Sequence, residues 1–147
     1  MQATDSQTPQ SPQNPLYERY ASRDMARLFS SAHRFGTWRR LWIALAEAES
    51  ELGLPISAEQ ITALREAAPR LDLDRVAELE RQTRHDVVAH LRHFAEQAGD
   101  QAVGAGGIIH LGATSAFVTD NTDILVAREA LELLRGRLGA AISELAT

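Results

Sequence analysis

Residues 124–145 read ILVAREALELLRGRLGAAISEL, the most regular helical pattern in the chain. Large apolar side chains recur every seven residues, at Ile124, Leu131, Leu138 and Leu145. Smaller or further apolar residues stand between them, at Ala127, Leu134 and Ala141. We call these seven residues the seam, because their spacing is typical of the apolar contact line of a helix bundle or coiled coil. A seam of this length needs partner helices of similar length.

The helices that the sequence predicts upstream of the seam are all shorter. Their expected ranges are about Arg23–Ser30, Thr37–Leu52, 58–67, Asp72–Gln82 and Arg84–Ala98. No pair of strands is indicated, so we expect an all-α fold: an N-terminal helical domain followed by the first long helix of a central helix bundle. We further expect the chain to end inside that bundle helix, or at its end. Its partner helices would then come from downstream sequence or from other subunits.

Helix ends are marked by familiar capping residues. Ser22 is a plausible N-cap, and Ser57 followed by Gln60 is a capping box. Gly53 with Pro55, and later Pro69, end their helices. Apolar residues form one face of each of two helices: Trp38, Leu41, Trp42, Leu45 and Leu52 in the first, and Val87, Leu91 and Phe94 in the second.

The segments outside the helices differ in composition. Residues 1–14 contain Gln, Ser, Thr and Pro with almost no apolar side chain, so we expect a disordered tail. Residues 99–107 are glycine-rich and are expected to form a flexible loop. The predicted domain organisation is therefore a tail over 1–14, a helical domain over 15–112 and the start of a bundle domain over 113–147.

Composition excludes several functional classes. All 15 basic residues are arginine and the formal net charge is −5, which argues against a nucleic-acid-binding surface. The chain has no cysteine, so neither a disulfide framework nor a thiolate metal site is possible. No signal-peptide pattern and no membrane-spanning apolar run is present, and we expect a cytoplasmic protein.

Two polar clusters stand out because a helical scaffold needs neither of them to fold. The first is Thr83-Arg84-His85-Asp86, which brings a cation, an imidazole and a carboxylate to an expected helix start. A helix N-terminus attracts anions, and an arginine adds a fork for phosphate or carboxylate. Taken alone, the cluster is also explained by a capped helix with a surface Arg–Asp pair. Asp86, His90 and His93 share a helix face and leave a metal site as an alternative.

The second cluster is His110-Leu111-Gly112-Ala113-Thr114-Ser115, at a junction between a loop and the long helix. It offers an imidazole, two hydroxyl groups and a glycine that allows close approach to the backbone. The hydroxyl groups of Thr114 and Ser115 could equally serve as helix caps. Asp120, Asn121 and Asp123 could add capping and acidic groups to the first turn.

Taken in order, these segments resemble the adenylosuccinate lyases of the fumarase/aspartase superfamily, in the form found in animals and some bacteria. The matching stretches are Arg19-Tyr20-Ala21-Ser22, 37–42 (TWRRLW), Arg84-His85-Asp86-Val87, 108–115 (IIHLGATS) and 120–123 (DNTD). The resemblance implies a lyase of purine biosynthesis that converts adenylosuccinate to AMP and fumarate, and the succinyl-carboxamide ribotide (SAICAR) to its carboxamide (AICAR) and fumarate. It implies β-elimination without metal or organic cofactor, in a homotetramer.

The resemblance also implies roles for individual residues. Arg19 and Tyr20 match residues that bind the nucleotide phosphate. Arg84, His85 and Asp86 match a nucleotide-binding stretch in which the histidine assists the acid side of catalysis. Thr114 and Ser115 match the pair that holds the succinyl carboxylate, and His110 matches a histidine lining that pocket.

Two features of such enzymes are not found in these 147 residues: the general-acid histidine and the serine base on a flexible signature loop. We therefore expect the chain to be inactive alone. Two alternatives remain open at this point. One is a sister lyase acting on argininosuccinate, aspartate or malate. The other is a non-enzymatic helical module that assembles through the seam.

Overall fold

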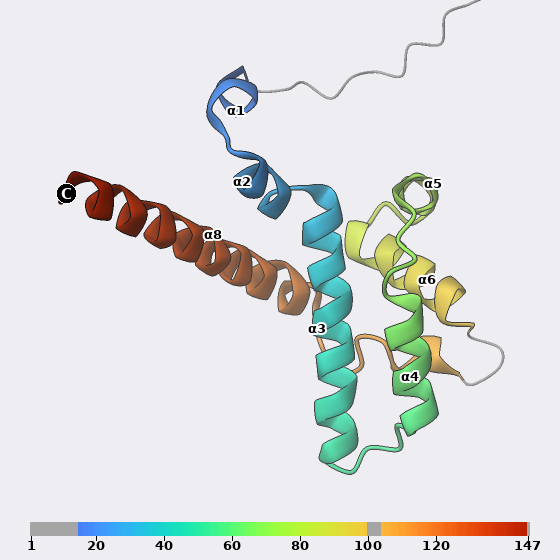
Figure 1. Cartoon of the computed structure of the whole chain (residues 1–147). Helices are drawn as coiled ribbons and strands as arrows, with labels where there is room; N and C mark the ends of the chain where they lie inside the picture. Colours follow the sequence, from blue (N-terminus) through green and yellow to red (C-terminus); the bar gives the residue numbers. More distant parts are fainter. Residues whose placement is uncertain (1–14, 100–103, 147) are drawn as a thin grey trace, which may run out of the picture.

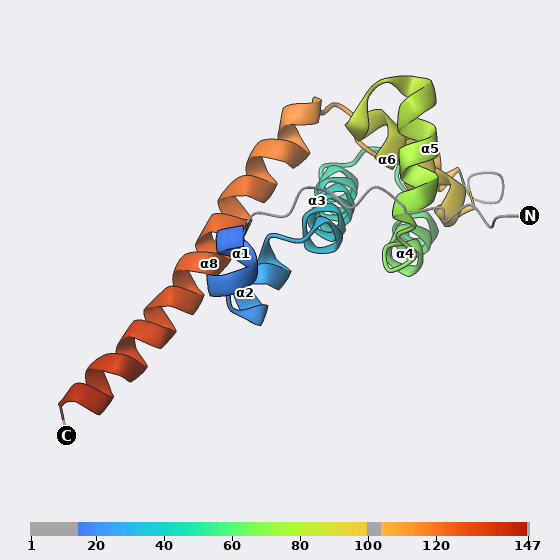
Figure 2. The same ribbon diagram turned by 90° about the horizontal axis from the view of Figure 1, so that it is seen from above.

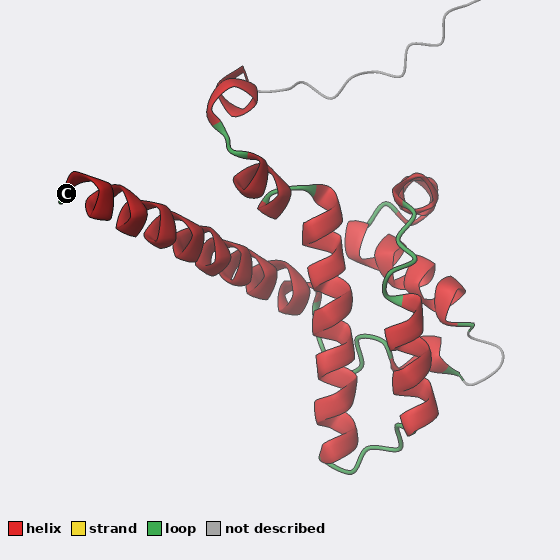
Figure 3. Ribbon diagram, viewed as in Figure 1, coloured by secondary structure: helices red, strands yellow, loops and turns green. Residues whose placement is uncertain are grey.

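The computed structural model describes residues 15–99 and 104–146, and every regular element in this part of the chain is helical (Figures 1 and 3). The all-α prediction is therefore confirmed. In chain order the elements are α1 (Pro15–Tyr20), α2 (Arg23–Leu28), α3 (Ser31–Glu51), α4 (Ala58–Ala67), α5 (Leu73–Thr83), α6 (Asp86–Ala98), the 3-10 helix η1 (Ala105–Ile108) and α8 (Ser115–Leu145).

Helix α3 is the central support of the fold. Trp38, Trp42 and Ala46 on one of its faces are buried, with at most 1% of each side chain exposed. Helices α4 and α6 pack with α3 around these residues, and Figure 1 shows them on the side of α3 away from α8. Because two tryptophans bury large areas, this face supplies much of the hydrophobic stabilisation of the domain.

A buried arginine fixes the end of α4 against α3. Arg39 is only 1% exposed, and its Nη1 donates to the carbonyl oxygens of Ala67 (3.0 Å) and Ala68 (3.1 Å). Its guanidinium also lies 4.8 Å from the ring centroid of Phe94 on α6. Burial lowers the pKa of Arg39 to about 10, with a smaller contribution from Arg70. One side chain thus satisfies the last carbonyl groups of α4 and contacts α6.

Helix α8 packs against α3 through Val118 in the apolar core and through polar contacts, and then extends beyond α3 (Figure 2). Arg34 Nη1 lies 2.7 Å from Asp123 Oδ1, and His33 Nε2 lies 2.8 Å from Glu129 Oε2. The large seam residues face away from the chain, with exposed fractions of 68% at Ile124, 66% at Leu131 and 63% at Leu138. None of the described helices is long and apolar enough to cross a membrane.

Several predicted helix ends are confirmed. The hydroxyl group of Ser22 accepts a hydrogen bond from Met25 N at the start of α2. Ser57 and Gln60 form the predicted capping box, because each side chain bonds the backbone N–H of the other residue. The predicted tail, residues 1–14, lies outside the described residues.

The predicted start of α3 is wrong by six residues. The helix begins at Ser31, because Ser30 has extended backbone and its hydroxyl group accepts from His33 N at 3.2 Å. Threonine is a common N-cap residue, but the hydroxyl group of Thr37 lies inside the helix and donates back to the carbonyl oxygen of His33 at 2.9 Å. Leu52, predicted on the buried face, is 81% exposed because the helix has already ended at Glu51.

Three further boundaries differ from the prediction. Helix α6 begins at Asp86 rather than Arg84. Part of the expected 99–107 loop is the 3-10 helix η1, while residues 100–103 lie outside the described part. The 120–123 stretch is not in the first turn of α8, because that helix already begins at Ser115 with Thr114 as N-cap.

Candidate functional site

The first polar cluster forms the sharp junction between α5 and α6. Arg84 ends α5 in the left-handed region, with φ 54° and ψ 32°, and His85 is extended as the N-cap of α6. A left-handed residue other than glycine costs about 1–2 kcal/mol, because its Cβ approaches the following carbonyl oxygen. Such backbone ends many helices and also clusters at functional sites. Here it turns the chain so that Arg84 and His85 protrude between two helices.

Hydrogen bonds hold this junction in place. Thr83 Oγ1 donates to the carbonyl oxygen of His85 at 3.0 Å. His85 Nδ1 accepts from Val88 N at 3.4 Å, and Asp86 Oδ1 accepts from Val87 N at 2.7 Å. Because Nδ1 is turned to the helix backbone, Nε2 is the nitrogen of His85 that is left for a ligand.

The charges of the cluster suit an anion that exchanges protons. The side chain of His85 is 47% exposed, and its Nδ1 lies 3.3 Å from Asp86 Oδ1. Protonation of Nδ1 would replace the Val88 hydrogen bond with an ion pair to Asp86. Among the described residues, no carboxylate lies within ion-pair distance of the exposed Arg84. Its guanidinium is therefore available beside the positive end of α6.

The second polar cluster is a turn between η1 and α8. His110 also has left-handed backbone, with φ 68°, and Ala113 N donates to its carbonyl oxygen at 3.3 Å. The His110 ring is held from α3, because Trp42 Nε1 donates to His110 Nδ1 at 3.0 Å. Burial lowers the pKa of His110 below its ordinary value, so the neutral imidazole is favoured at neutral pH.

The same turn ends at the start of α8. Thr114 is the N-cap, and its Oγ1 accepts from Ala116 N at 3.4 Å, so the capping interpretation of Thr114 is confirmed. Ser115 is the first helical residue. A cap does not prevent ligand binding, because a threonine hydroxyl group keeps its own proton to donate. Two adjacent hydroxyl groups and the N–H group of Ser115 thus lie at the positive end of a 31-residue helix, which suits a carboxylate.

The structure does not bring Arg19 and Tyr20 to these clusters. Both lie at the end of α1, where Tyr20 is 77% exposed. Helix α1 is attached to α2 through a 2.9 Å hydrogen bond from the Tyr17 hydroxyl group to the carbonyl oxygen of Ala26. Figures 1 and 2 both show α1 far from the α5–α6 junction and from the start of α8. Within one chain, the predicted phosphate-binding pair is therefore separate from the other predicted site residues.

The alternative metal site is not formed. His90 is 3% exposed and stacks on Phe35, with ring centroids 3.9 Å apart, whereas Asp86 is exposed beside His85. His93 Nε2 accepts from Asp72 N at 2.9 Å. In the described part of the chain, no group of three or more His, Asp or Glu residues is placed to hold a metal ion.

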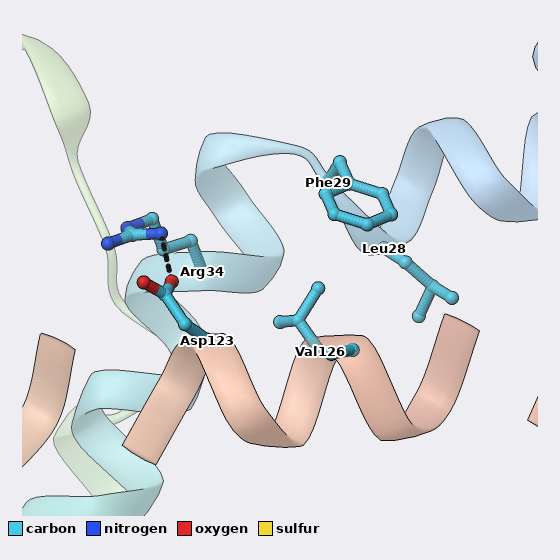
Figure 4. A pocket seen from close by; sticks show the side chains of 6 residues that line it. Leu28, Phe29, Arg34, Asp123 and Val126 are labelled. Atoms are coloured by element: carbon cyan, nitrogen blue, oxygen red, sulfur yellow. Dashed lines mark hydrogen bonds and ion pairs between the residues drawn. The ribbon is translucent and has the colours of Figure 1, made fainter. Parts of the chain in front are cut away.

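A separate cavity lies where α2, α3 and α8 meet (Figure 4). Its volume is about 200 Å³, and Leu28, Phe29 and Val126 supply apolar lining. The Arg34–Asp123 ion pair closes one side. None of the predicted site residues lines it, and its only charged side chains neutralise each other. It therefore lacks the free polar groups that the two clusters offer.

Comparison with known proteins points to one enzyme. No protein-family model matches the chain. Adenylosuccinate lyase of Saccharomyces cerevisiae is 45% identical over 136 residues, which is 90% of this chain. Adenylosuccinate lyase of Schizosaccharomyces pombe is 46% identical over 136 residues, or 89% of the chain. The similarity extends to the adenylosuccinate lyase of Methanocaldococcus jannaschii, which is 33% identical over 126 residues, or 85% of the chain.

The chain is much shorter than these relatives. Each alignment spans 27% of the related protein, so the chain corresponds to about a quarter of its length. The matched portion is an N-terminal one.

Proposed function

This chain is homologous to an N-terminal portion of the adenylosuccinate lyases, and we propose that it supplies the nucleotide-binding and carboxylate-binding parts of a lyase site. One observation carries the proposal. In a chain 45% identical to a known lyase, the two polar clusters are held by core helices and still present unpaired donors to solvent. These donors are therefore free to bind an anionic ligand.

The reaction we propose is β-elimination, from adenylosuccinate to AMP and fumarate and from SAICAR to AICAR and fumarate. A base removes a proton next to a carboxylate, and an acid protonates the departing nitrogen. Negative charge develops on the succinyl portion, so fixed hydrogen-bond donors around it lower the barrier. No step requires a metal ion or an organic cofactor.

Each predicted site residue has a part in this proposal. Arg84 and Asp86 bind the nucleotide, and His85 assists the acid side of catalysis. The free guanidinium of Arg84 and the exposed imidazole of His85 support these roles. Thr114 and Ser115 hold the succinyl carboxylate, with His110 lining the same pocket. Arg19 and Tyr20 bind the nucleotide phosphate.

The remaining parts of the site come from outside these residues. We propose a homotetramer in which Arg19 and Tyr20 contribute to a site built with other subunits, which is consistent with their distance from the clusters in one chain. The exposed seam supports an interface with long helices, and the start of α8 at Ser115 supports a domain boundary near residue 112. The general-acid histidine and the serine base lie in other segments, so the chain alone does not turn over substrate.

The cellular setting follows from the same proposal. A lyase that acts on adenylosuccinate and SAICAR belongs to purine biosynthesis and works in the cytoplasm on free nucleotides. Its partners are the small-molecule substrate and further copies of its own subunit, without nucleic acid or membrane.

A hybrid enzyme tests the proposed function. This chain would replace the homologous N-terminal portion of the Saccharomyces cerevisiae adenylosuccinate lyase, and fumarate release from adenylosuccinate would be followed. We expect turnover by the hybrid and none by the 147-residue chain alone. Argininosuccinate, aspartate and malate serve as the competing substrates. A folded hybrid that prefers one of them would favour a sister lyase, and a folded hybrid without any turnover would favour a purely structural module.

A further inference from the structure

We propose that Trp42 is a positioning residue that holds His110 as a neutral donor, with its proton on Nε2. The role of that donor, which is to bind the carboxylate at the 110–115 turn, rests on the proposed function. The state of the imidazole itself is a property of this chain and is tested separately. No sequence pattern links the two residues, which are 68 positions apart.

The indole that contacts His110 cannot easily turn. Trp42 is 1% exposed and stacks on Phe94, with ring centroids 6.1 Å apart and planes 29° apart. The rings of Trp38 and Trp42 are arranged edge to face, with centroids 6.1 Å apart and planes at 73°. Because close-packed aromatic side chains keep their rotamers, the direction of the Trp42 N–H bond is fixed by the core.

That fixed N–H determines the protonation of His110. An indole nitrogen is only a donor, so His110 Nδ1, at 3.0 Å from it, must be the unprotonated acceptor. A neutral imidazole without a proton on Nδ1 carries it on Nε2. An imidazolium would point a second N–H at the indole and leave a buried donor unpaired. The packing of the two rings, 6.0 Å apart and nearly perpendicular, fits this edge-on arrangement.

The remaining nitrogen of His110 is left for a ligand. In residues 15–99 and 104–146, no group is placed to hydrogen-bond His110 Nε2, and the residue is only partly buried. Ala113 N closes the turn onto the His110 carbonyl oxygen, and Thr114 follows directly. The carboxylate of Glu49 on α3 lies close to Gly112 of the same turn. A neutral Nε2–H, in a turn that also carries the hydroxyl groups of Thr114 and Ser115, supplies donors for a carboxylate.

Nitrogen NMR of the chain with labelled histidine tests this proton placement directly. The His110 signals would be identified with His110→Asn. We expect the wild-type chain at neutral pH to show Nδ1 as an unprotonated acceptor and Nε2 as the protonated nitrogen. A wild-type spectrum with the proton on Nδ1 would overturn the proposal without any substitution at a core position.

Two matched substitutions test the part played by Trp42. Trp42→Phe keeps a buried ring and removes the N–H group, so we expect a mixture of His110 tautomers. Trp38→Phe is the control, because Trp38 is equally buried at 1% and its Nε1 has no hydrogen-bond partner in the described structure. The proposal fails when Trp42→Phe leaves the His110 tautomer as in the Trp38→Phe control.

Kinetics of the hybrid enzyme separates this inference from the proposed function. We expect Trp42→Phe to reduce kcat/KM about tenfold relative to Trp38→Phe, the loss typical of a misplaced hydrogen-bond donor. A hybrid without activity, together with the expected tautomer, would reject the proposed function and keep the proton placement. An active hybrid in which both variants behave alike would reject the positioning role.

Discussion

Arg84 and His110 have the same unusual backbone conformation, with φ values of 54° and 68°. Within residues 15–99 and 104–146, they are the only residues other than glycine with positive φ. Each lies in one of the two polar clusters, and each stands between two helical elements. Strained backbone thus coincides with both polar clusters, a pattern typical of junctions that are kept for their geometry rather than for stability.

Substitution of Arg84 tests this strain. We expect Arg84→Gly to be about 1 kcal/mol more stable than Arg84→Ala, because glycine adopts the left-handed region without a Cβ clash. Arg92, exposed inside α6, is the matched control, where glycine should be about 1 kcal/mol less stable than alanine. Urea denaturation of the four variants gives both differences. If the alanine variant were more stable than the glycine variant at Arg84 as well as at Arg92, the left-handed conformation of Arg84 would be contradicted.

Buried His90 predicts a loss of stability in mild acid. Burial, followed by the charges of Arg39 and His93, lowers the pKa of His90 from 6.5 to about 4. Between these values the unfolded chain binds a proton that the folded chain does not, so stability is present above pH 6.5 and falls toward pH 4. The His90 contribution to this loss is at most about 3 kcal/mol.

His90→Phe removes the titrating group and keeps an aromatic ring against Phe35. We expect the free energy of unfolding to vary less between pH 7 and pH 5 in this variant than in the wild-type chain. Phe35→Leu is the control, because it weakens the same stack without changing a titrating group, and should lower stability by a similar amount at each pH. An unchanged pH dependence in His90→Phe would show that His90 is not the group responsible.

The seam predicts self-association. Leu131 and Leu138 are 66% and 63% exposed, and monomeric proteins rarely expose a long apolar stripe. We expect sedimentation of the chain to depend on its concentration, and Leu131→Glu with Leu138→Glu to shift it strongly toward monomer. Arg128→Glu with Arg135→Glu, two further exposed positions of α8, is the charge-reversal control and should have a smaller effect. Identical sedimentation of the two double variants would mean that the seam is not the interface.

Local signals in the sequence were sufficient where a helix end depends on neighbouring residues. The caps at Ser22 and Ser57 and the seam pattern of α8 were predictable, because each depends on side chains within one or two turns. The start of α3 was not, because the hydroxyl group of Thr37 bonds backward within the helix instead of capping it. The residue type alone does not show whether a threonine caps a helix or bonds backward within it.

The candidate site was predictable in its residue types but not in its assembly. The two clusters were recognisable from their polar groups, and Thr114 was identified as a possible cap. The Trp42–His110 hydrogen bond joins α3 to a turn 68 residues later, and such a contact depends on how the helices pack. The left-handed backbone at Arg84 and His110 was likewise hidden, since residues other than glycine rarely adopt that conformation, even though histidine does so more often than arginine.

The measurement that tests the central claim most directly is kcat/KM for adenylosuccinate in the hybrid enzyme with His85→Ala and with Thr114→Ala. Arg92→Ala and Thr62→Ala are the controls, because both residues are exposed on helices outside the clusters. We predict losses of at least about a hundredfold for His85→Ala and tenfold for Thr114→Ala, with oligomeric state retained and both controls near wild type. Activity that survives both cluster substitutions would contradict the assignment of these residues to a lyase site.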